Sequence, residues 1–558
     1  MSGRTTSTRM LRRILGAQQV SERTGEPAAE VLERADAARA ERAADRERYD
    51  AVRGERGTIT RREVLIGGAA TMGAVALGST APAAAARQTA PTVAIVGAGL
   101  SGLRAAHWLW KVKGIRSTVY EGDTRVGGRV WTLRDHFAAG QIVEHGGAFI
   151  NTDHNAIRNL VNSLNLSLRE VGGGNQPPYG DTYWVDGRYS YDEANADWGA
   201  AWRAFKDALA AAPYPQTVQT RTASGVALDA LTVDEWIDRN IAGGTSGRFG
   251  AIMRSNAIAE YGLDPGEQSA LNLVYLLGWN PQNSLDPING ADERFTVVGG
   301  NDLIISRLVA ELPPGTVRTG HRLVAMTRTS GGAARLSFRV GNRTVDVTAD
   351  KAILSLPFTT LVDVDRTGAG LSPDKERAIR ELGLGANGKI HLQMRTRPWL
   401  AAGYGGVSYS PVHQFQCIWD DTVGQPGDGG GPIGASSPGI LCWFPGGSAT
   451  LDGWSGTPFG PAPTADVARL LSWVEPVFPG VTSAYDGVAY RDAWHLNPWS
   501  KGAYTCPRPG QYTGLFGIPE LPEGPWHFAG EHTSSEYYGF LNGAVVAGER
   551  AAKEVSLA

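Results

Sequence analysis

Cysteine is scarce in this sequence, which argues against a cysteine-ligated metal site. The 558 residues include three cysteines, and none of them forms a C-x-x-C pair or shows a metal-ligand spacing. They are Cys417, Cys442 and Cys506. We predict three buried thiols, with one disulfide as the open alternative.

A large charge of one sign and the common histidine motifs are missing too. Lysine and arginine number 53, and aspartate and glutamate number 56, so the formal net charge is −3. A chain balanced in this way has no electrostatic footprint for nucleic acid. The ten histidines contain no H-x-x-x-H or H-E-x-x-H pattern. We therefore predict neither a nucleic-acid partner nor a metal site.

Glycine, in contrast, is abundant, and three glycines near the start form a nucleotide-binding pattern. Gly97, Gly99 and Gly102 follow the apolar run 93–96 and precede an apolar segment at 103–110. This is the strand, turn and helix order of a dinucleotide fingerprint. The first glycine permits a tight turn, the second lets the backbone approach a pyrophosphate, and the third lets helix and strand pack closely.

Two more residues belong to this predicted nucleotide site. Ser101 lies in the first turn of the expected helix, whose free N–H groups and dipole favour phosphate. Glu121 ends a second strand-like run at 117–120, where a carboxylate can accept hydrogen bonds from ribose hydroxyls. Strand, helix and acid in this order predict a nucleotide site, although NAD would satisfy the pattern as well as FAD.

Two further glycine segments favour a flavin over NAD. Gly128 precedes Arg129, whose guanidinium can hold phosphate through forked hydrogen bonds. Gly146 and Gly147 form a pair on a predicted strand, where bare backbone can lie against a flat ring. The alternative interpretation is two ordinary glycine turns.

A second signature lies near the end of the chain, at Phe528-Ala-Gly-Glu-His-Thr533, and is followed by a glycine-opened helical segment at 539–550. Taken in order, these segments resemble the flavin-containing amine oxidase family, which includes monoamine oxidases, polyamine oxidases and L-amino-acid oxidases. The resemblance runs from about Pro91 to Val555 and is most specific at its two ends.

The resemblance implies an α/β fold with two domains. A Rossmann-like FAD-binding domain would be discontinuous in sequence, over 91–170, 290–357 and 484–558. A substrate domain of the α+β type, with a mixed sheet and helices, would occupy 171–289 and 358–483. Within it, 198–211 and 233–241 are predicted helices.

The family pattern also implies how the cofactor is bound. Val324 would meet the adenine through its backbone, while Gly530 and Glu531 would lie at the ribityl or pyrophosphate region. The helix after Gly539 would point its N-terminus at the flavin pyrimidine. Mammalian monoamine oxidases carry a flavin-linked cysteine where this chain has Ala503, so we expect non-covalent FAD.

Four residues match family positions close to the reacting amine. Lys389 would sit near flavin N5 through a water, and Trp494 begins the tract that reaches the flavin edge. Tyr504 and Phe540 match the two positions whose rings flank the amine path, where aromatic walls exclude water and tolerate positive charge. Without the family, Lys389 would be interpreted as a solvated lysine and the aromatic residues as core.

The implied reaction is hydride transfer from the amine-bearing carbon to flavin N5, followed by imine hydrolysis and by flavin reoxidation with O2 to give H2O2. Phe149 stands where one large subgroup of L-amino-acid oxidases has an arginine for the substrate carboxylate. We therefore predict an amine oxidase first and an L-amino-acid oxidase second. In the second case Arg254, Arg322 or Arg397 would supply the charge.

Two functions from other protein classes remain as further alternatives. A carotenoid-type desaturase or isomerase would share the flavin ends, but Lys389 and the Tyr504/Phe540 pair argue against it. A non-catalytic carrier of the same fold would not need the flavin-contacting residues. The oligomeric state is left open, with a homodimer as one option.

The first ninety residues have a different character. Residues 1–57 are rich in Arg, Glu and Ala, which predicts a solvated helix or disorder. Residues 58–90 contain Arg61 and Arg62, a weakly apolar uncharged stretch, and an A-x-A-like end at Ala86. This resembles a twin-arginine signal and predicts export by that machinery. A cytoplasmic or membrane-tethered protein is the alternative.

Overall fold

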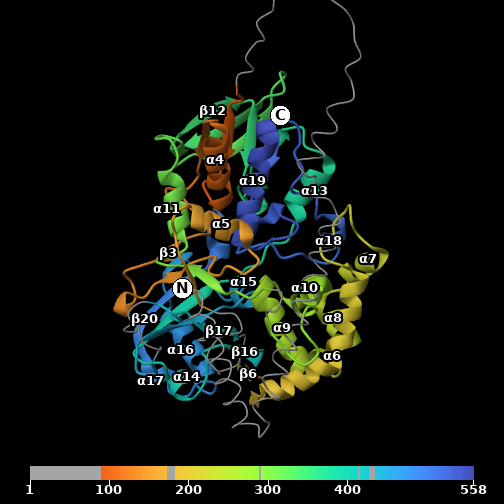
Figure 1. Cartoon of the computed structure of the whole chain (residues 1–558), viewed down its shortest axis with the longest axis vertical. Coiled ribbons are helices and arrows are strands. Elements are labelled where there is room, and N and C mark those ends of the chain that lie inside the picture. The colour runs from red at the N-terminus through yellow and green to blue at the C-terminus, as the bar shows by residue number, and fades with distance from the viewer. Residues whose placement is uncertain (1–89, 172–181, 288–290, 413–414, 426–433, 558) are drawn as a thin grey trace, which may run out of the picture. The chain divides into compact units, whose positions relative to one another are not determined.

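The computed structural model describes residues 90–171, 182–287, 291–412, 415–425 and 434–557 (Figure 1). The predicted charged extension over 1–57 lies outside these residues, and so does the predicted signal over 58–90 except for Ala90. Among the helices of the described ranges, none is long and apolar enough to cross a membrane.

A five-stranded parallel sheet carries the first glycine pattern. Its order is β21-β13-β1-β2-β9. The strands are β1 (Val93–Val96), β2 (Ser117–Tyr120), β9 (Val317–Arg318), β13 (Lys351–Leu354) and β21 (Trp526–Phe528). They come from three distant parts of the chain. All four residues of β1 are buried, as expected for a strand covered on both faces.

Each face of this sheet packs against a different layer. Helices α4 (Leu100–Lys113) and α19 (Leu541–Leu557) lie side by side on one face, where Val93 and Ile95 join their core (Figure 1). Ala94 and Val96 point to the other face and join a four-stranded sheet of order β12-β11-β10-β14. The strands of that sheet are β10 (Arg322–Arg328), β11 (Ala334–Val340), β12 (Arg343–Ala349) and β14 (Asp365–Gly368).

A third, eight-stranded mixed sheet has the order β19-β20-β15-β18-β17-β16-β6-β7. Its strands are β6 (Thr182–Trp184), β7 (Arg188–Tyr189), β15 (Lys389–Met394), β16 (Ser408–Ser410), β17 (Gln416–Asp420), β18 (Gly439–Trp443), β19 (Phe459–Pro461) and β20 (Tyr485–Asp492). Side chains alternate along β15: Ile390, Leu392 and Met394 enter an apolar core. The polar residues of β15 therefore share the opposite face.

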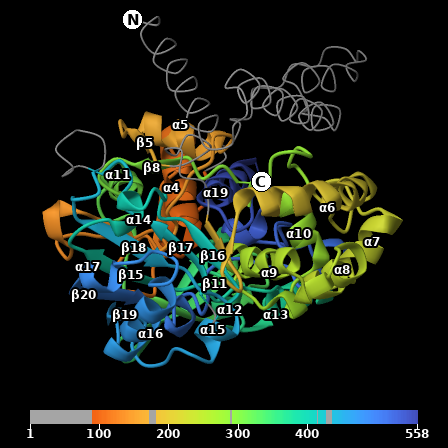
Figure 2. The same cartoon turned by 90° about the horizontal axis from the view of Figure 1, so that it is seen from below.

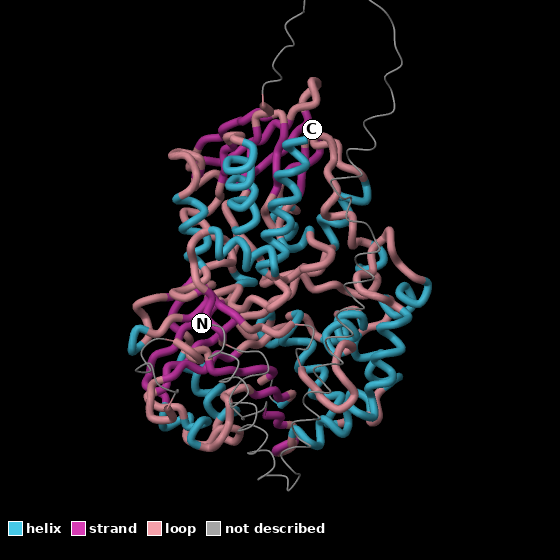
Figure 3. The backbone as a smooth tube through the Cα atoms, in the orientation of Figure 1, coloured by secondary structure: helices cyan, strands magenta, loops and turns pink. Residues whose placement is uncertain are grey.

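Helices α6–α10 gather on the side of the molecule opposite β15 and β20 (Figure 2). They are α6 (Tyr191–Ala211), α7 (Ala223–Asp229), α8 (Val233–Asn240), α9 (Arg248–Tyr261) and α10 (Ala270–Leu277). The strands, in turn, form an upper and a lower group (Figure 3). Capping boxes start α6 at Ser190 and α8 at Thr232, where each side chain accepts from the backbone three residues on.

Shorter elements complete the described structure. The remaining strands are β3 (Thr132–Leu133), β4 (Val143–Glu144), β5 (Leu168–Glu170) and β8 (Phe295–Val297). The remaining α-helices are α5 (Asn155–Ser163), α11 (Asp302–Ala310), α12 (Phe358–Leu361), α13 (Pro373–Glu381), α14 (Pro398–Ala401), α15 (Ser448–Leu451), α16 (Thr464–Val474), α17 (Val481–Ala484) and α18 (Gln511–Gly514).

The predicted α/β class with mixed sheets and helices is confirmed. The exact division into the two predicted domains stays a prediction, because residues 91–278 and 285–558 cluster as one compact unit. All three cysteines are free and buried, as predicted.

Candidate flavin and substrate site

The turn between β1 and α4 has the shape that its three glycines predict. Gly97 adopts φ +101°, a conformation that side chains rarely allow. A Cβ on Gly102 would lie 2.1 Å from the carbonyl oxygen of Gly97, so a side chain cannot fit there. A Cβ on Gly99, in contrast, would meet nothing within 4 Å. The open space beside Gly99 fits a pyrophosphate that approaches the backbone.

This contrast between two glycines predicts opposite outcomes for two alanine variants. We expect Gly99→Ala to keep the thermal midpoint of the apoprotein but to weaken FAD binding, because its methyl group enters the pyrophosphate position. Gly102→Ala should lower the free energy of unfolding by about 1–3 kcal/mol through overpacking. Differential scanning fluorimetry of apoprotein and a FAD titration check both. A destabilised Gly99→Ala apoprotein would contradict the assignment.

The carboxylate of Glu121 is hydrogen-bonded to this turn. Its Oε2 accepts from the backbone N–H of Ala98 at 2.7 Å, and its Oε1 accepts from that of Asp123 at 2.8 Å. Burial raises the pKa of Glu121, and the two N–H donors partly offset the rise. The His321 N–H donates to the Glu121 carbonyl at 2.7 Å, which brings the start of β10 alongside.

Val324 lies on β10 at an irregularity in the ladder. The register of β10 against β11 shifts between Leu323 and Ala325, so Val324 falls at a bulge. A bulged residue has backbone groups outside the regular ladder. This agrees with the predicted backbone contact to adenine, which itself stays a prediction.

Gly128 lies against the same turn. A Cβ on Gly128 would sit 3.5 Å from the Cα of Gly99, and Gly128 adopts φ +57°. The Gly127 N–H donates to the Ala98 carbonyl at 2.8 Å. On the other side, Ser101 Oγ accepts from the Gly530 N–H at 2.9 Å. Segments more than 400 residues apart therefore meet at one turn.

Arg129 and Glu531 form an ion pair between the first glycine-rich segments and the signature at 528–533. Nη1 of Arg129 lies 2.9 Å from Glu531 Oε1 and donates to the Ala503 carbonyl at 2.6 Å. Oε2 of Glu531 accepts from Thr505 Oγ1 at 2.9 Å and from the Gly539 N–H at 2.6 Å. Burial opposes ionisation, but Arg129 and the Gly539 N–H hold the pKa of Glu531 below its ordinary value.

Backbone closes the space beside Gly146, and a leucine side chain crowds Gly147. A Cβ on Gly146 would lie 2.1 Å from the Arg129 carbonyl oxygen, and one on Gly147 would lie 2.7 Å from a methyl of Leu541. Trp494 is buried and its Nε1 donates to the carbonyl of His145 at 2.7 Å. Trp494 is thus hydrogen-bonded to the residue before the glycine pair and packs beside Gly146.

Lys389 lies against the same glycine pair. It is 4% exposed, and its Nζ donates to the carbonyls of Glu144 at 2.8 Å and Gly146 at 2.9 Å. Its ammonium also lies 5.8 Å from the ring centroid of Trp419 and 5.9 Å from that of Phe444. Lys389 is therefore buried and oriented, which excludes the solvated alternative. Its water-mediated contact with flavin stays a prediction.

Tyr504 lies next to Gly539, the residue that precedes Phe540. A Cβ on Gly539 would be 3.6 Å from Tyr504 Cδ2, and the Phe540 ring packs at 4.9 Å between centroids against His154. The Tyr504 hydroxyl donates to the Ala259 carbonyl at 3.1 Å, which fixes its ring. The arrangement suits two walls of a substrate path.

Two carboxylates that sequence reasoning missed lie close to these residues. Glu260 lies in the last turn of α9, next to Ala259, and Glu293 precedes β8. Burial raises the pKa of both groups, to about 7 for Glu293, and the charge of Glu293 raises that of Glu260 further. Lys389 opposes the rise at Glu293, and both carboxylates raise the pKa of Tyr504. The two acids are 33 positions apart and carry no motif, so no local signal marked them.

Phe149, the residue in place of an arginine, also belongs to this cluster. Its ring centroid lies 5.9 Å from that of Trp419, the ring beside the Lys389 ammonium. The position next to Lys389 that an arginine would fill is therefore aromatic.

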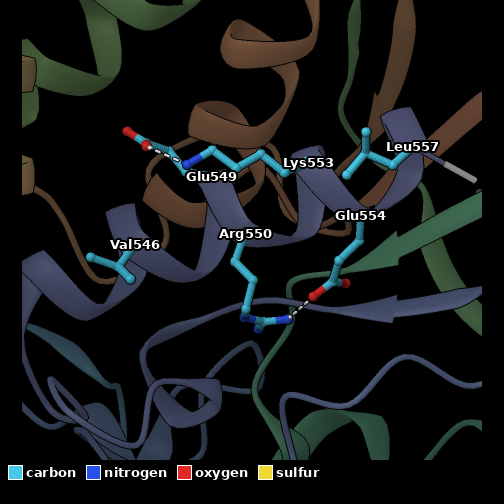
Figure 4. A pocket seen from close by; sticks show the side chains of 6 residues that line it. All are labelled: Val546, Glu549, Arg550, Lys553, Glu554 and Leu557. Carbon is cyan, nitrogen blue, oxygen red and sulfur yellow. Dashed lines mark hydrogen bonds and ion pairs between the residues drawn. The ribbon is translucent and has the colours of Figure 1, made fainter. Parts of the chain in front are cut away.

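A separate surface pocket lies along the C-terminal helix (Figure 4). It is lined by Val546, Glu549, Arg550, Lys553, Glu554 and Leu557, all from α19. Nη1 of Arg550 pairs with Glu554 at 2.7 Å, and Lys553 lies 3.9 Å from Glu549. The four charged side chains of this pocket pair with one another within α19. We therefore place the chemistry at Lys389 and not at this pocket.

The site residues thus form two groups. The glycine turn, Glu121 and the Arg129–Glu531 pair fit the phosphates and ribose of a dinucleotide. The glycine pair, Lys389, Trp494 and the Tyr504 and Phe540 rings lie beyond it, where a flavin ring and its substrate would meet.

Comparisons with known proteins agree with this geometry. The family model described as flavin containing amine oxidoreductase matches residues 100–556. YobN of Bacillus subtilis, provisionally named an L-amino-acid oxidase, is 26% identical over 496 residues, which cover 83% of this chain and 94% of that protein. AofH of Mycobacterium tuberculosis, provisionally named a flavin-containing monoamine oxidase, is 27% identical over 489 residues, covering 83% and 96%.

A solved structure shares the fold. Cyclohexylamine oxidase from Brevibacterium oxydans superposes with a TM-score of 0.69 and 21% identity, covering 84% of this chain and 99% of that one. At this identity the likeness shows the fold alone.

Proposed function

Because the chain belongs to the flavin-containing amine oxidoreductase family, and is therefore a flavin-dependent oxidoreductase that acts on amines with FAD as cofactor, we propose that it deaminates a primary or secondary amine oxidatively. FAD, when bound, supplies the electron acceptor for the carbon that bears the amine. The products would be an aldehyde or ketone and ammonia or a smaller amine.

The observation that most favours an amine over an amino acid as substrate is the pair of carboxylates at Glu260 and Glu293, here called the acid pair. Glu260 and Glu293 are close enough for the charge of one to raise the pKa of the other. Since the charge of Glu293 raises the pKa of Glu260, Glu293 is the carboxylate that ionises first, and its negative charge would attract an ammonium and repel a substrate carboxylate. An amino acid would place its carboxylate near these groups, so the electrostatics of the site favour a plain amine.

Two of the three arginines proposed for an amino acid's carboxylate lie beside acidic side chains, and the third is exposed. Arg254 pairs with Asp234 at 2.7 Å, and Arg322 is exposed on β10. Arg397 is buried beside Asp420, with 3.9 Å between Nε and the carboxylate. Together with Phe149, these positions support the amine.

The chain's own residues would bind and orient the substrate. Tyr504 and Phe540 would hold the amine between their rings and exclude water. The reacting amine must be neutral for its lone pair to drive oxidation, so the rate should rise with pH through the pKa of the bound amine. Lys389 would fix the backbone of the glycine pair against the flavin.

Three further parts of the proposal rest on the family pattern and on the N-terminal sequence. We propose non-covalent FAD, because Ala503 offers no side chain for attachment. O2 would be the electron acceptor and would yield H2O2. Export by the twin-arginine machinery would place the enzyme outside the cytoplasm.

Anaerobic bleaching of the flavin absorption band tests the substrate class. We expect a panel of primary and secondary amines to bleach the band and a panel of L-amino acids to leave it unchanged. Bleaching by L-amino acids alone would overturn the proposal in favour of an L-amino-acid oxidase, the class named for YobN.

Glu293→Gln tests the acid pair in the same experiment. It removes the carboxylate that ionises first, so it should raise the amine concentration needed for half-maximal bleaching by about tenfold above pH 7, since one charge is worth about 1.4 kcal/mol at a moderate separation. Glu267→Gln removes a more exposed carboxylate that pairs with Arg508 and should change nothing. Equal effects of the two variants would contradict a role for the acid pair.

A further inference from the structure

The polar face of β15 joins the eight-stranded sheet to the segment that carries the glycine pair. Lys389, His391 and Gln393 alternate with apolar residues and are all buried. Lys389 donates to the carbonyls on either side of His145, and Gln393 Oε1 accepts from the Ala138 N–H at 2.7 Å. Three consecutive polar side chains of one strand thus face residues 138–146.

His391, the middle residue of this row, reaches the segment through a carboxylate. Its Nε2 lies 3.4 Å from Asp492 Oδ2, and the other oxygen of Asp492 lies 2.5 Å from Nδ1 of His145. The side chains of His391, Asp492 and His145 are 0% exposed. Asp492 is also the cross-strand neighbour of Lys389, between β15 and β20. Asp492 therefore lies between two imidazoles beside the lysine, hydrogen-bonded to His145 and within ion-pair distance of His391.

The opposite edge of His391 faces a second carboxylate. Its Nδ1 lies 3.2 Å from Asp421 Oδ2, and Asp421 Oδ1 accepts from Nε1 of Trp419 at 3.1 Å. Trp419 is the ring beside the Lys389 ammonium. Burial opposes the charge of His391, but Cys442 and the two carboxylates hold its pKa well above the ordinary value. The ring of His391 therefore lies between two carboxylates, one of which contacts His145 and the other Trp419.

His145 is the point where this row acts on the site. The carbonyls of Glu144 and Gly146, one on each side of it, accept from the same ammonium. A rotation of the backbone at His145 would turn both carbonyls away together. Its ring stacks on Trp131 with 3.7 Å between centroids, and its N–H donates to the Trp131 carbonyl at 2.9 Å. Among the described residues, Asp492 is the carboxylate that pairs with the ring.

We propose that Asp492 and His391 are positioning residues for the amine oxidation: they hold His145 so that the Glu144 and Gly146 carbonyls keep Lys389 and the glycine pair in register. They touch neither substrate nor flavin in this assignment. The inference rests on the proposed function only for its kinetic readout.

Asp492→Asn tests this role with two independent measurements. The limiting rate constant of flavin reduction by the best amine should fall about tenfold, because a displacement near 1 Å at the reacting centre costs up to about 100-fold. The dissociation constant of the amine should stay within about twofold of wild type. Hydrogen–deuterium exchange at 142–147 should rise, in protein with or without substrate.

Asp420→Asn is the matched control. Asp420 is an equally buried carboxylate of the same sheet, but it accepts from Trp399 Nε1 at 3.0 Å and lies beside Arg397. It should lower the thermal midpoint without altering exchange at 142–147 or the rate at saturating amine. His391→Gln, which keeps a donor of similar size, should reproduce the Asp492→Asn pattern if that variant does not fold.

Three results would overturn the proposal. They are unchanged exchange at 142–147 in Asp492→Asn, an equal change in Asp420→Asn, and one equivalent of a tightly held divalent metal in the purified wild type. The last follows because ligand atoms of His391, Asp421 and Cys442 lie within 4.8 Å of one another, so a metal would hold the ring instead. If no amine bleaches the wild type, the proposed function fails, and the exchange measurement still decides the role of Asp492.

Discussion

Lys389→Met is expected to lower kcat/KM for the amine by at least about 100-fold and to lower the thermal midpoint. The ammonium donates to two buried carbonyls, at Glu144 and Gly146. Methionine keeps the length of the side chain but leaves both acceptors without this donor, at about 1–3 kcal/mol each. The backbone that should lie against the flavin would then shift, and misplacement near 1 Å costs about 100-fold in rate.

A surface lysine provides the control for this variant. Lys111 is 44% exposed and pairs with Glu311 at 2.7 Å. Lys111→Met should leave both the rate and the thermal midpoint close to wild type, because exposed ion pairs contribute about 0–1 kcal/mol. Single-turnover flavin reduction and scanning fluorimetry measure both quantities. A Lys389→Met enzyme with wild-type reduction would show that the lysine only fills space.

The nucleotide end of the site could be predicted from the sequence because its requirements are local. Gly97 needs a positive φ and Gly102 a missing side chain, and both needs are met within a few residues of the turn. Glu121 follows at the end of the next strand, so strand order alone places it beside the turn. The ion pair of Arg129 with Glu531 was not predicted, since 402 positions separate the two residues and each was assigned to the cofactor instead.

The substrate end could not be predicted in the same detail because it is assembled by tertiary contacts. Alternation along 389–394 marked a strand, but which face was buried depended on the segment at 138–146, far away in sequence. The carboxylates of Glu260 and Glu293 and the bridge from Asp492 to His145 join residues with no fixed spacing. A single sequence gives no signal for such pairs.

Helix boundaries show a smaller failure with a local cause. The helix expected from Trp198 begins seven residues earlier, at Tyr191, whereas the helix expected over 233–241 is found at Val233–Asn240. The signal at the earlier start was a capping box, in which Ser190 and Glu193 satisfy each other's backbone N–H groups. Apolar periodicity begins only later in that helix, so a prediction based on periodicity missed its first two turns.

The ion pair between the chain ends should determine both stability and FAD retention. Arg129→Gln removes the guanidinium that neutralises buried Glu531. Removal of one partner of a buried pair costs about 3–5 kcal/mol, because the remaining charge stays buried without compensation. Arg129 is 22% exposed, so we expect a loss toward the lower end, together with a lower FAD content after gel filtration.

A double variant and the pH dependence of stability distinguish the effect of the Arg129 charge from that of its side-chain packing. Arg129→Gln combined with Glu531→Gln leaves no unpaired charge, so it should be more stable than Arg129→Gln alone in a double-mutant cycle. In the wild type, the pKa of Glu531 is held below its ordinary 4.5, so its ionised form stabilises the fold above pH 4.5 and loses this effect as the pH falls through the lowered pKa. The stability gap between wild type and Arg129→Gln should therefore be widest at neutral pH and close in acid. A gap that stays constant down to acid pH would mean that Arg129 acts through packing of its stem, and the charge would then have no part in joining the two ends of the chain.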